Sequence, residues 1–419
     1  METRDTRKSL FRRVEKAMAA IHRSPDVAST VADTASAIIE NFKGDLGVKG
    51  GRLYQRRDGG YELKRSFGDV KAVAPGLLVP ATYPPVEQVI DDGVVVLGLD
   101  APGVDAEFER SLGVDRFAAI AVGDDEYILS FDVEAGALDE ELVSSLSILR
   151  HTVDQKLRQY RYVSALQEAR RIQMSILPKR SVRRGELEVA GYSSPAELVG
   201  GDYFDFIGVS DRILGIAIAD SSGHGLPAAL QVRDVYTGLR MGVERDFKIV
   251  RTVERLNRII HHSKMTTRFV SLFYGEVEED NLMYVNAGHN HPLHFHSAGV
   301  TPLEQTGMVL GPSPTATYSR GFRRLERGDA LLLFTDGMVE AHGPGGEEFG
   351  VERLTQAFRE LRGKPCDEIA RELVKKVEEW TGGAEPEDDR TVVVLKRHHG
   401  PAPGGDTRTT TGVFPMTVT

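Results

Sequence analysis

Acidic residues stand at four places where an apolar, strand-like stretch begins or ends. Taken singly, an Asp-Gly pair is typical of a turn, and an acidic run such as EPEDD is typical of a solvated loop. Their recurrence at strand ends indicates carboxylates that gather at one edge of a sheet. The motifs are VGGDYFDF with Asp202, ILGIAIADSSGHG with Asp220, LLLFTDGMVEA with Asp336, and EPEDDRTVVVL with Asp388 and Asp389.

The first two motifs are close enough in the sequence to form a hairpin. Segments 201–208 and 213–220 have strand patterns joined by the turn GVSDR, which would bring Asp202 and Asp220 to the same sheet edge. Carboxylates crowded together repel one another and raise each other's pKa unless cations lie between them. Oxygen ligands favour Mg²⁺ or Mn²⁺ over zinc, and flanking glycines let backbone carbonyls approach a metal or a phosphate. These residues therefore predict a divalent-cation site.

The composition limits the class of protein. The chain has 419 residues, of which 41% are hydrophobic and 27% charged, enough for two or three folded domains. We expect no membrane helix and no signal peptide, because no apolar run of about 18 residues occurs and the N-terminus is highly charged. The single cysteine, Cys366, excludes an intrachain disulfide and favours a cytoplasmic location. The net charge of −10 argues against nucleic-acid binding.

The residue pattern changes along the chain and divides it into four segments. Residues 10–135 combine amphipathic helix with strands separated by Gly, Asp and Pro turns, which predicts an α/β domain. Residues 138–177 contain no Gly or Pro and predict a long helical linker. Residues 185–397 alternate strands and helices, as expected for an α+β domain of antiparallel sheets flanked by helices. Residues 398–419, rich in Gly, Pro and Thr, predict a disordered tail.

The linker carries apolar residues at alternating heptad spacing, with Lys156 in the one polar position. This pattern fits two arrangements. One is a coiled coil that joins two copies of the chain in a homodimer, and the other is a helix packed on its own domain. The apolar positions are Leu142, Leu146, Leu149, Val153, Tyr160 and Val163. In the domain that follows, helices are expected at 226–242, 250–263, 351–362 and 366–380.

Six motifs follow one another between residues 199 and 395: VGGDYFDF, D-x-SGHG-x-x-AAL, NAGHNHPL, LERGDALLLFTDGMVEA, EEFGVERL and DDRTVVVL. In order and spacing, residues 165–397 resemble the SpoIIE/RsbU-type bacterial serine phosphatases of the metal-dependent (PPM, type-2C) superfamily. The resemblance implies an α/β/β/α sandwich, two Mn²⁺ or Mg²⁺ ions, and hydrolysis of phosphoserine or phosphothreonine in a protein substrate.

The resemblance also implies roles for the acidic residues. Asp220 would bridge both cations, and the backbone carbonyl of Ser221 would be a ligand of the second. Asp336 and Asp388 would complete the shell of the first cation. Asp202 would support the cluster, directly or through water.

Three further residues take their interpretation from the same comparison. Asp389 is the alternative to Asp388, which we prefer because the family pattern D-[DN]-x-T begins there. His224 lies four residues after Asp220, whereas better-known eukaryotic members have a histidine two residues after the aspartate. We therefore transfer no acid role to His224 and interpret it as a helix-start residue that orders the loop. His289, in NAGHNHPL, is expected to be structural or to lie near the substrate cleft.

Residues 10–135 resemble a GAF domain, with a PAS-like sensor as the alternative. GAF domains bind small molecules or serve only in dimerisation, so a small-molecule ligand is one expectation. A thioether-linked bilin is excluded, because no cysteine precedes Cys366. A signal in this domain would act on the phosphatase through the 138–177 helix.

The phosphatase resemblance implies a phosphorylated STAS-type anti-sigma-factor antagonist as the substrate, in a partner-switching pathway. Two alternatives differ in class: a scaffold that binds a partner without turnover, and a hydrolase of small phosphate esters. No G-x-x-x-x-G-K-[ST] loop occurs, which argues against an NTP-dependent kinase or ATPase.

Overall fold

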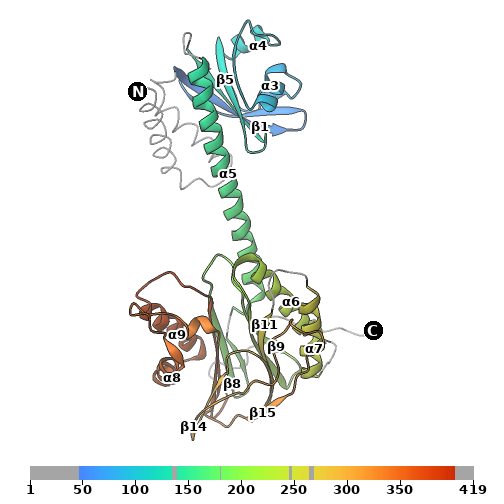
Figure 1. The fold of residues 1–419 in the computed structure, drawn as a ribbon, viewed down its shortest axis with the longest axis vertical. Helices are drawn as coiled ribbons and strands as arrows, with labels where there is room; N and C mark the ends of the chain where they lie inside the picture. The colour runs from blue at the N-terminus through green and yellow to red at the C-terminus, as the bar shows by residue number, and fades with distance from the viewer. Residues whose placement is uncertain (1–46, 135–138, 180, 245–247, 264–268, 402–419) are drawn as a thin grey trace. The chain divides into compact units, whose positions relative to one another are not determined.

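The chain forms two compact units, Met1–Ser164 and Ala165–Thr419, and the boundary between them falls within a helix. The computed structural model describes residues 47–134, 139–179, 181–244, 248–263 and 269–401 (Figure 1). The first part of the predicted 10–135 domain and most of the expected tail lie outside these residues. Within them, no helix is long and apolar enough to cross a lipid bilayer.

One antiparallel sheet forms the centre of the first unit, with strands in the order β3-β2-β1-β6-β5-β4. Apolar residues alternate along its strands, so that Leu129 and Phe131 pack on one face and Ile128 on the other. The strands are β1 (Val48–Arg57), β2 (Gly60–Gly68), β3 (Leu78–Pro80), β4 (Val94–Gly98), β5 (Arg116–Val122) and β6 (Tyr127–Val133).

Helices cover both faces of this sheet. On one face, α3 (Pro84–Asp92) contributes Val86 and Val89 to the core, and Phe108 of α4 (Ala106–Ser111) packs against it. On the other face lies the first part of α5 (Asp139–Ile176), the long helix predicted over 138–177.

The heptad positions of α5 pack inside the chain. A stripe of apolar residues at spacings of three and four fits the face of a sheet as well as it fits a second helix. Of the two arrangements that the sequence allowed, the structure therefore shows packing on the helix's own domain as far as Leu157. The residues buried against the first sheet are Leu142, Leu146, Leu149, Val153 and Leu157, whereas Tyr162 and Val163 are exposed.

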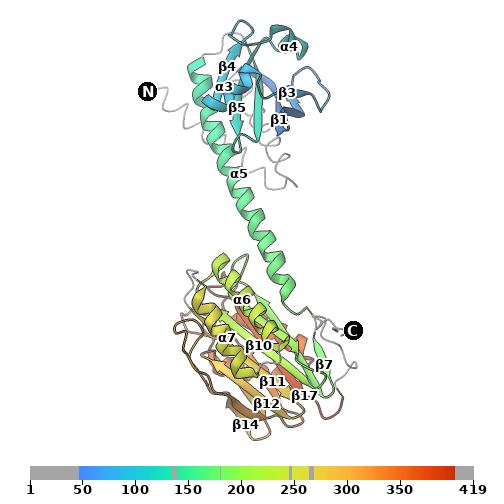
Figure 2. The ribbon, with the colours of Figure 1, turned by 90° about the vertical axis from the view of Figure 1, so that its right-hand side faces the viewer.

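The second unit is a sandwich of two antiparallel sheets with helices on both outer faces (Figures 1 and 2). One sheet has the order β15-β12-β11-β10-β9 and is covered by α6 (Gly225–Glu244) and α7 (Ile249–His262). The other has the order β14-β13-β16-β17-β8-β7 and is covered by α8 (Gly350–Leu361) and α9 (Cys366–Trp380). The predicted α/β/β/α sandwich is confirmed.

The sandwich alternates strands and helices, as the sequence predicts for residues 185–397. Each of the four helices begins and ends within two residues of its predicted bounds. The strands are β7 (Val182–Arg184), β8 (Leu187–Ser194), β9 (Asp202–Gly208), β10 (Ile213–Ser221), β11 (Val270–Glu278), β12 (Asn281–Ala287), β13 (Leu293–His296), β14 (Gly299–Pro302), β15 (Gly321–Arg324), β16 (Ala330–Phe334) and β17 (Arg390–Arg397).

Cys366 lies at the start of α9, inside the core that α8 and α9 form with the sheet. Its side chain is fully buried and its Sγ donates to the carbonyl oxygen of Glu188 at 3.4 Å. Burial raises the pKa of the Cys366 thiol well above its usual value. The thiol therefore acts as a small apolar side chain.

Candidate metal centre

Asp202 and Asp220 meet at one edge of the sandwich. They are directly opposite residues of the antiparallel strands β9 and β10, which form the predicted hairpin. Asp202 is buried, and Asp220 is partly buried beside it. The chain thus places two carboxylates on neighbouring strands, where like charges destabilise the pair.

Asp336 reaches the same region from the other sheet. Strand β16 ends at Phe334, and the short 3₁₀ helix η1 (Asp336–Met338) follows. Between them, the buried Thr335 donates a hydrogen bond from Oγ1 to Oδ2 of Asp202 at 2.9 Å. This bond joins the two sheets at the residue next to Asp336.

The segment that carries Asp388 and Asp389 lies against η1. A Cβ atom added to Gly337 would lie 2.1 Å from the carbonyl oxygen of Asp389. Only glycine permits this approach of two backbones. Because Gly337 has no side chain, the turn after Asp336 can pack directly against the backbone just before β17.

The two adjacent aspartates have different surroundings. Asp389 is buried: its Oδ1 accepts from the amide of Ala196 at 2.8 Å, and its Oδ2 from the amide of Gly201 at 2.5 Å. Asp388 is exposed, and its Oδ1 accepts from the amide of Asp389 at 2.8 Å. Asp389 thus stabilises the loop before β9 through hydrogen bonds, whereas the exposed carboxylate of Asp388 is available to bind a cation.

The carboxyl groups affect one another's protonation. Burial raises the pKa of Asp220 to about 8, and the negative charges of Asp336 and Asp388 add to this effect. Burial, then Asp388 and Glu340, raises the pKa of Asp336 to about 6. Burial, then Asp220, raises the pKa of Asp202 well above its usual value. The site carries more negative charge than the protein compensates, which is the condition that a bound cation relieves.

Ser221 presents its backbone rather than its hydroxyl group. The side chain is buried, and Oγ donates to Oε1 of Gln231 on α6 at 2.6 Å. A Cβ atom added to Gly201 would lie 2.9 Å from the Ser221 carbonyl oxygen, so that oxygen lies beside the loop leading to Asp202. A hydroxyl held in this way is a poor nucleophile, because no base among the described residues contacts it.

The two histidines have different environments. His224 is 83% exposed, with Nδ1 at 2.7 Å from Oε1 of Glu197. His289 is buried, and its Nδ1 shares a hydrogen bond of 2.8 Å with Ser271 Oγ, on the residue opposite Asp220 in β11. Burial lowers the pKa of His289 to about 3, so the ring is neutral. His289 therefore belongs to the packing that supports β10.

The donor set suits a hard divalent cation. Carboxylate oxygens and a backbone carbonyl are the ligands that Mg²⁺ and Mn²⁺ prefer, and the described residues near the site include no thiol. Among the residues that the structure describes, no three His, Cys, Asp or Glu side chains are arranged tightly enough to hold an ion as they stand. The suitability of this site for a divalent cation therefore rests on its oxygen donors and on its uncompensated negative charge.

A family model described as "Stage II sporulation protein E (SpoIIE)" matches residues 210–398. These residues form a SpoIIE domain. The family resemblance predicted from the motifs is thereby confirmed for the second half of the chain.

Relatives of the SpoIIE domain agree with this match. The chain is 28% identical over 243 residues to "Phosphoserine phosphatase RsbU" of Bacillus subtilis (strain 168). This alignment covers 56% of this chain and 70% of that protein. It is 23% identical over 182 residues to "Phosphoserine phosphatase RsbP" of the same organism, covering 42% of this chain and 45% of that protein. The solved SiaA-PP2C domain of Pseudomonas aeruginosa has the same fold, with a TM-score of 0.50, 21% identity, and coverage of 57% of this chain and 98% of that domain.

The structure places two further residues near the candidate metal centre, and neither belongs to the predicted set. Glu340 lies four residues after Asp336, and its amide donates to the Asp336 carbonyl oxygen at 2.8 Å, which keeps it near the cluster. The spacing D-G-M-V-E could have indicated it. Gln173 of α5 contacts Gly200, two residues before Asp202. No local sequence pattern predicts the contact between Gln173 and Gly200.

Proposed function

We propose that the chain is a metal-dependent protein phosphatase that hydrolyses phosphoserine or phosphothreonine. The observation that carries the proposal is the meeting of Asp202 and Asp220 from one sheet with Asp336 and Asp388 from the other, at one edge of the sandwich that contains the SpoIIE match. Two relatives described as phosphoserine phosphatases support it.

Two Mn²⁺ or Mg²⁺ ions would be held by Asp220, Asp336, Asp388 and the Ser221 carbonyl, with Asp202 in support. When bound, such ions supply charge that stabilises a phosphoryl group and activates water. The protein's own part is to hold its carboxylates in place. Thr335 fixes Asp202 by its hydrogen bond, and Asp389 fixes the loop before β9 through backbone amides.

The substrate in this proposal is a phosphorylated STAS-type anti-sigma-factor antagonist in a cytoplasmic partner-switching pathway. The motif order and the similarity to RsbU support this choice. The front unit would act as the sensor. Its influence would pass through α5, whose Gln173 contacts the loop before Asp202. The exposed Tyr162 and Val163 leave part of α5 available for a homodimer.

The test is hydrolysis by the full chain, first of para-nitrophenyl phosphate with Mn²⁺ and then of a panel of phosphorylated STAS proteins. We expect the wild-type chain to turn over substrate, and we expect Asp336→Asn to reduce this turnover by roughly 100-fold or more. The matched control is Asp211→Asn in the exposed turn between β9 and β10, which removes the same charge away from the site.

Three outcomes separate the alternatives. Turnover of a phosphorylated STAS protein well above that of small esters supports the whole proposal. Efficient turnover of small esters alone would support a small-ester hydrolase. No turnover of either, with a folded domain and added Mn²⁺, would support a scaffold.

A further inference from the structure

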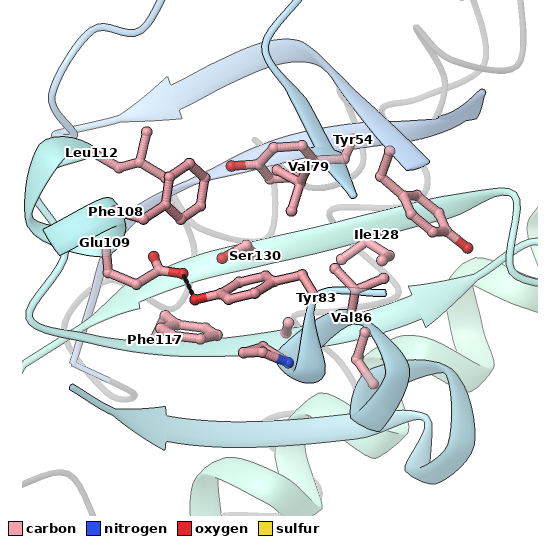
Figure 3. Close-up of a pocket in the computed structure, with 14 residues that line it drawn as sticks. Tyr54, Val79, Tyr83, Val86, Phe108, Glu109, Leu112, Phe117, Ile128 and Ser130 are labelled. Carbon is pink, nitrogen blue, oxygen red and sulfur yellow. Dashed lines mark hydrogen bonds between the residues drawn. The ribbon is translucent and has the colours of Figure 1, made fainter. Parts of the chain in front are cut away.

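The first unit has a cavity of about 50 Å³, partly open to solvent, between its sheet and helices α3 and α4 (Figure 3). By the same measure a water molecule needs about 10–15 Å³, so the cavity holds a group of a few heavy atoms. Aromatic rings form much of its wall, and one acidic residue is included. Tyr54, Tyr83, Phe108 and Phe117 surround the space, with the Glu109 carboxyl group directed at the Tyr83 hydroxyl.

Glu109 is an unusual lining residue, because it is only 6% exposed. Tyr83 donates a hydrogen bond from its hydroxyl to Oε1 of Glu109 at 2.9 Å. That hydroxyl also accepts from the amide of Asp105 at 3.1 Å, which fixes its direction. Tyr83 gives the only hydrogen bond to the Glu109 carboxylate from any residue that the structure describes, and it brings no positive charge.

The nearest buried cation, Arg52, forms its hydrogen bonds with other groups. Arg52 is 1% exposed, and its guanidinium donates to Asp132 and to the carbonyl oxygen of Leu112, each at 2.7 Å. The buried group of Arg52, Asp132 and Glu109 therefore contains one positive and two negative side chains. Burial raises the pKa of Glu109, as expected for a carboxylate whose charge is not neutralised.

The aromatic rings are arranged to favour positive charge. The rings of Tyr83 and Phe108 meet edge to face, with centroids 5.7 Å apart and planes at 80°. Ring faces carry negative electrostatic potential, and a cation within about 6 Å of a ring centroid is attracted to it. Rings set at right angles beside a buried carboxylate favour a compact cation over an anion or a neutral group.

We propose that this cavity binds a small organic ammonium ion, with its charged head beside Glu109 and against the aromatic rings that line the cavity. A methylated ammonium head matches the size of the cavity, and its methyl groups match the apolar wall. Its single positive charge balances the surplus carboxylate. A negatively charged ligand would be repelled by the Glu109 carboxylate.

The experiment is isothermal titration of the full chain in an amine-free buffer with choline and with 3,3-dimethylbutan-1-ol. The second compound replaces the ammonium nitrogen by carbon, so the pair differs in charge alone. We expect choline to bind at least roughly tenfold more tightly than the alcohol. Glu109→Gln keeps an acceptor for Tyr83 and should remove this difference. Glu107→Gln, an exposed change on the same helix, should preserve it.

Equal affinities for choline and the alcohol would overturn the proposal, as would no binding of choline or tetramethylammonium. Unchanged choline affinity in a folded Glu109→Gln would also overturn it. If that variant fails to fold, Phe108→Leu keeps the carboxylate and removes one ring. It should weaken choline binding more than alcohol binding, and equal weakening of both contradicts the proposal.

Discussion

Gln173 of α5 and Gly200 exchange two hydrogen bonds, with Nε2 donating to the Gly200 carbonyl oxygen at 2.6 Å and the Gly200 amide donating to Oε1 at 3.2 Å. On its other side, Gly200 packs so closely on Asp389 that an added Cβ would lie 2.3 Å from Oδ2. The end of the long helix is therefore one contact away from the residues that position Asp202.

Replacing Gln173 by Ala should weaken the apparent affinity for Mn²⁺ by roughly tenfold, because it leaves a buried amide of the loop before Asp202 without a partner. The measurement is a Mn²⁺ titration of phosphatase activity. The control is Gln167→Ala, an exposed glutamine of the same helix. Equal Mn²⁺ dependence in the two variants would show that the Gln173 contact does not support the site.

Asp220→Asn should move activity and stability in opposite directions. The buried cluster raises the pKa of Asp220 to about 8, so at neutral pH folding of the metal-free protein must protonate a carboxyl group that is ionised in the unfolded chain. Asparagine avoids this cost, so we expect metal-free protein to gain about 1 kcal/mol, or roughly 2–4 °C in Tm. Activity with Mn²⁺ should fall by roughly 100-fold or more. Thermal melts with chelator and assays with Mn²⁺ measure the two effects. A lower metal-free Tm would argue that Asp220 is not repelled by its neighbours.

Asp388→Asn and Asp389→Asn should differ, although the residues are adjacent. Asp389 accepts from the amides of Ala196 and Gly201, so its loss should reduce the free energy of unfolding by about 1–3 kcal/mol. Within the described part of the chain, the Asp388 carboxylate accepts a hydrogen bond only from the amide of Asp389, so its loss should reduce Mn²⁺-dependent activity and leave stability nearly unchanged. Urea unfolding paired with Mn²⁺ titration distinguishes them. The reverse pattern would exchange their roles.

The stability of the first unit should depend on pH through Glu109. Its pKa is raised in the folded protein by burial, ahead of the lowering effects of Tyr83 and Arg52. The folded state then binds more protons than the unfolded state, so its stability falls as the pH rises above the usual value of 4.5. Glu109→Gln should gain stability over the wild type between about pH 4.5 and pH 7. A difference that is flat across this range would contradict the shift.

The acidic motifs could be predicted because each is local. Asp202 and Asp220 close a hairpin whose turn is visible in the sequence, and Asp336 directly follows an apolar strand. Helix bounds were predictable because glycines stand at the starts, as Gly225 and Gly350 do with positive φ. The α/β/β/α sandwich was predicted from the family resemblance rather than from the hydrophobic periodicity of the sequence.

Contacts between distant segments could not be predicted in this way. The heptads of α5 do not reveal whether they face a sheet or a second chain, because both bury the same stripe. Glu109 has the sequence pattern of an exposed residue on a short helix, and its burial depends on Tyr83, 26 residues away. The roles of Asp388 and Asp389 separate only when the amides of the loop before β9 are placed.

The buried position of Cys366 has a practical consequence for spectroscopy. It is the only cysteine among the 419 residues, and its thiol is fully enclosed and held protonated. A cysteine introduced at an exposed position would be the one thiol that a maleimide dye or a nitroxide reagent reaches in the folded protein. Single-site fluorescent or spin labels can therefore be attached without first removing the native cysteine from its core.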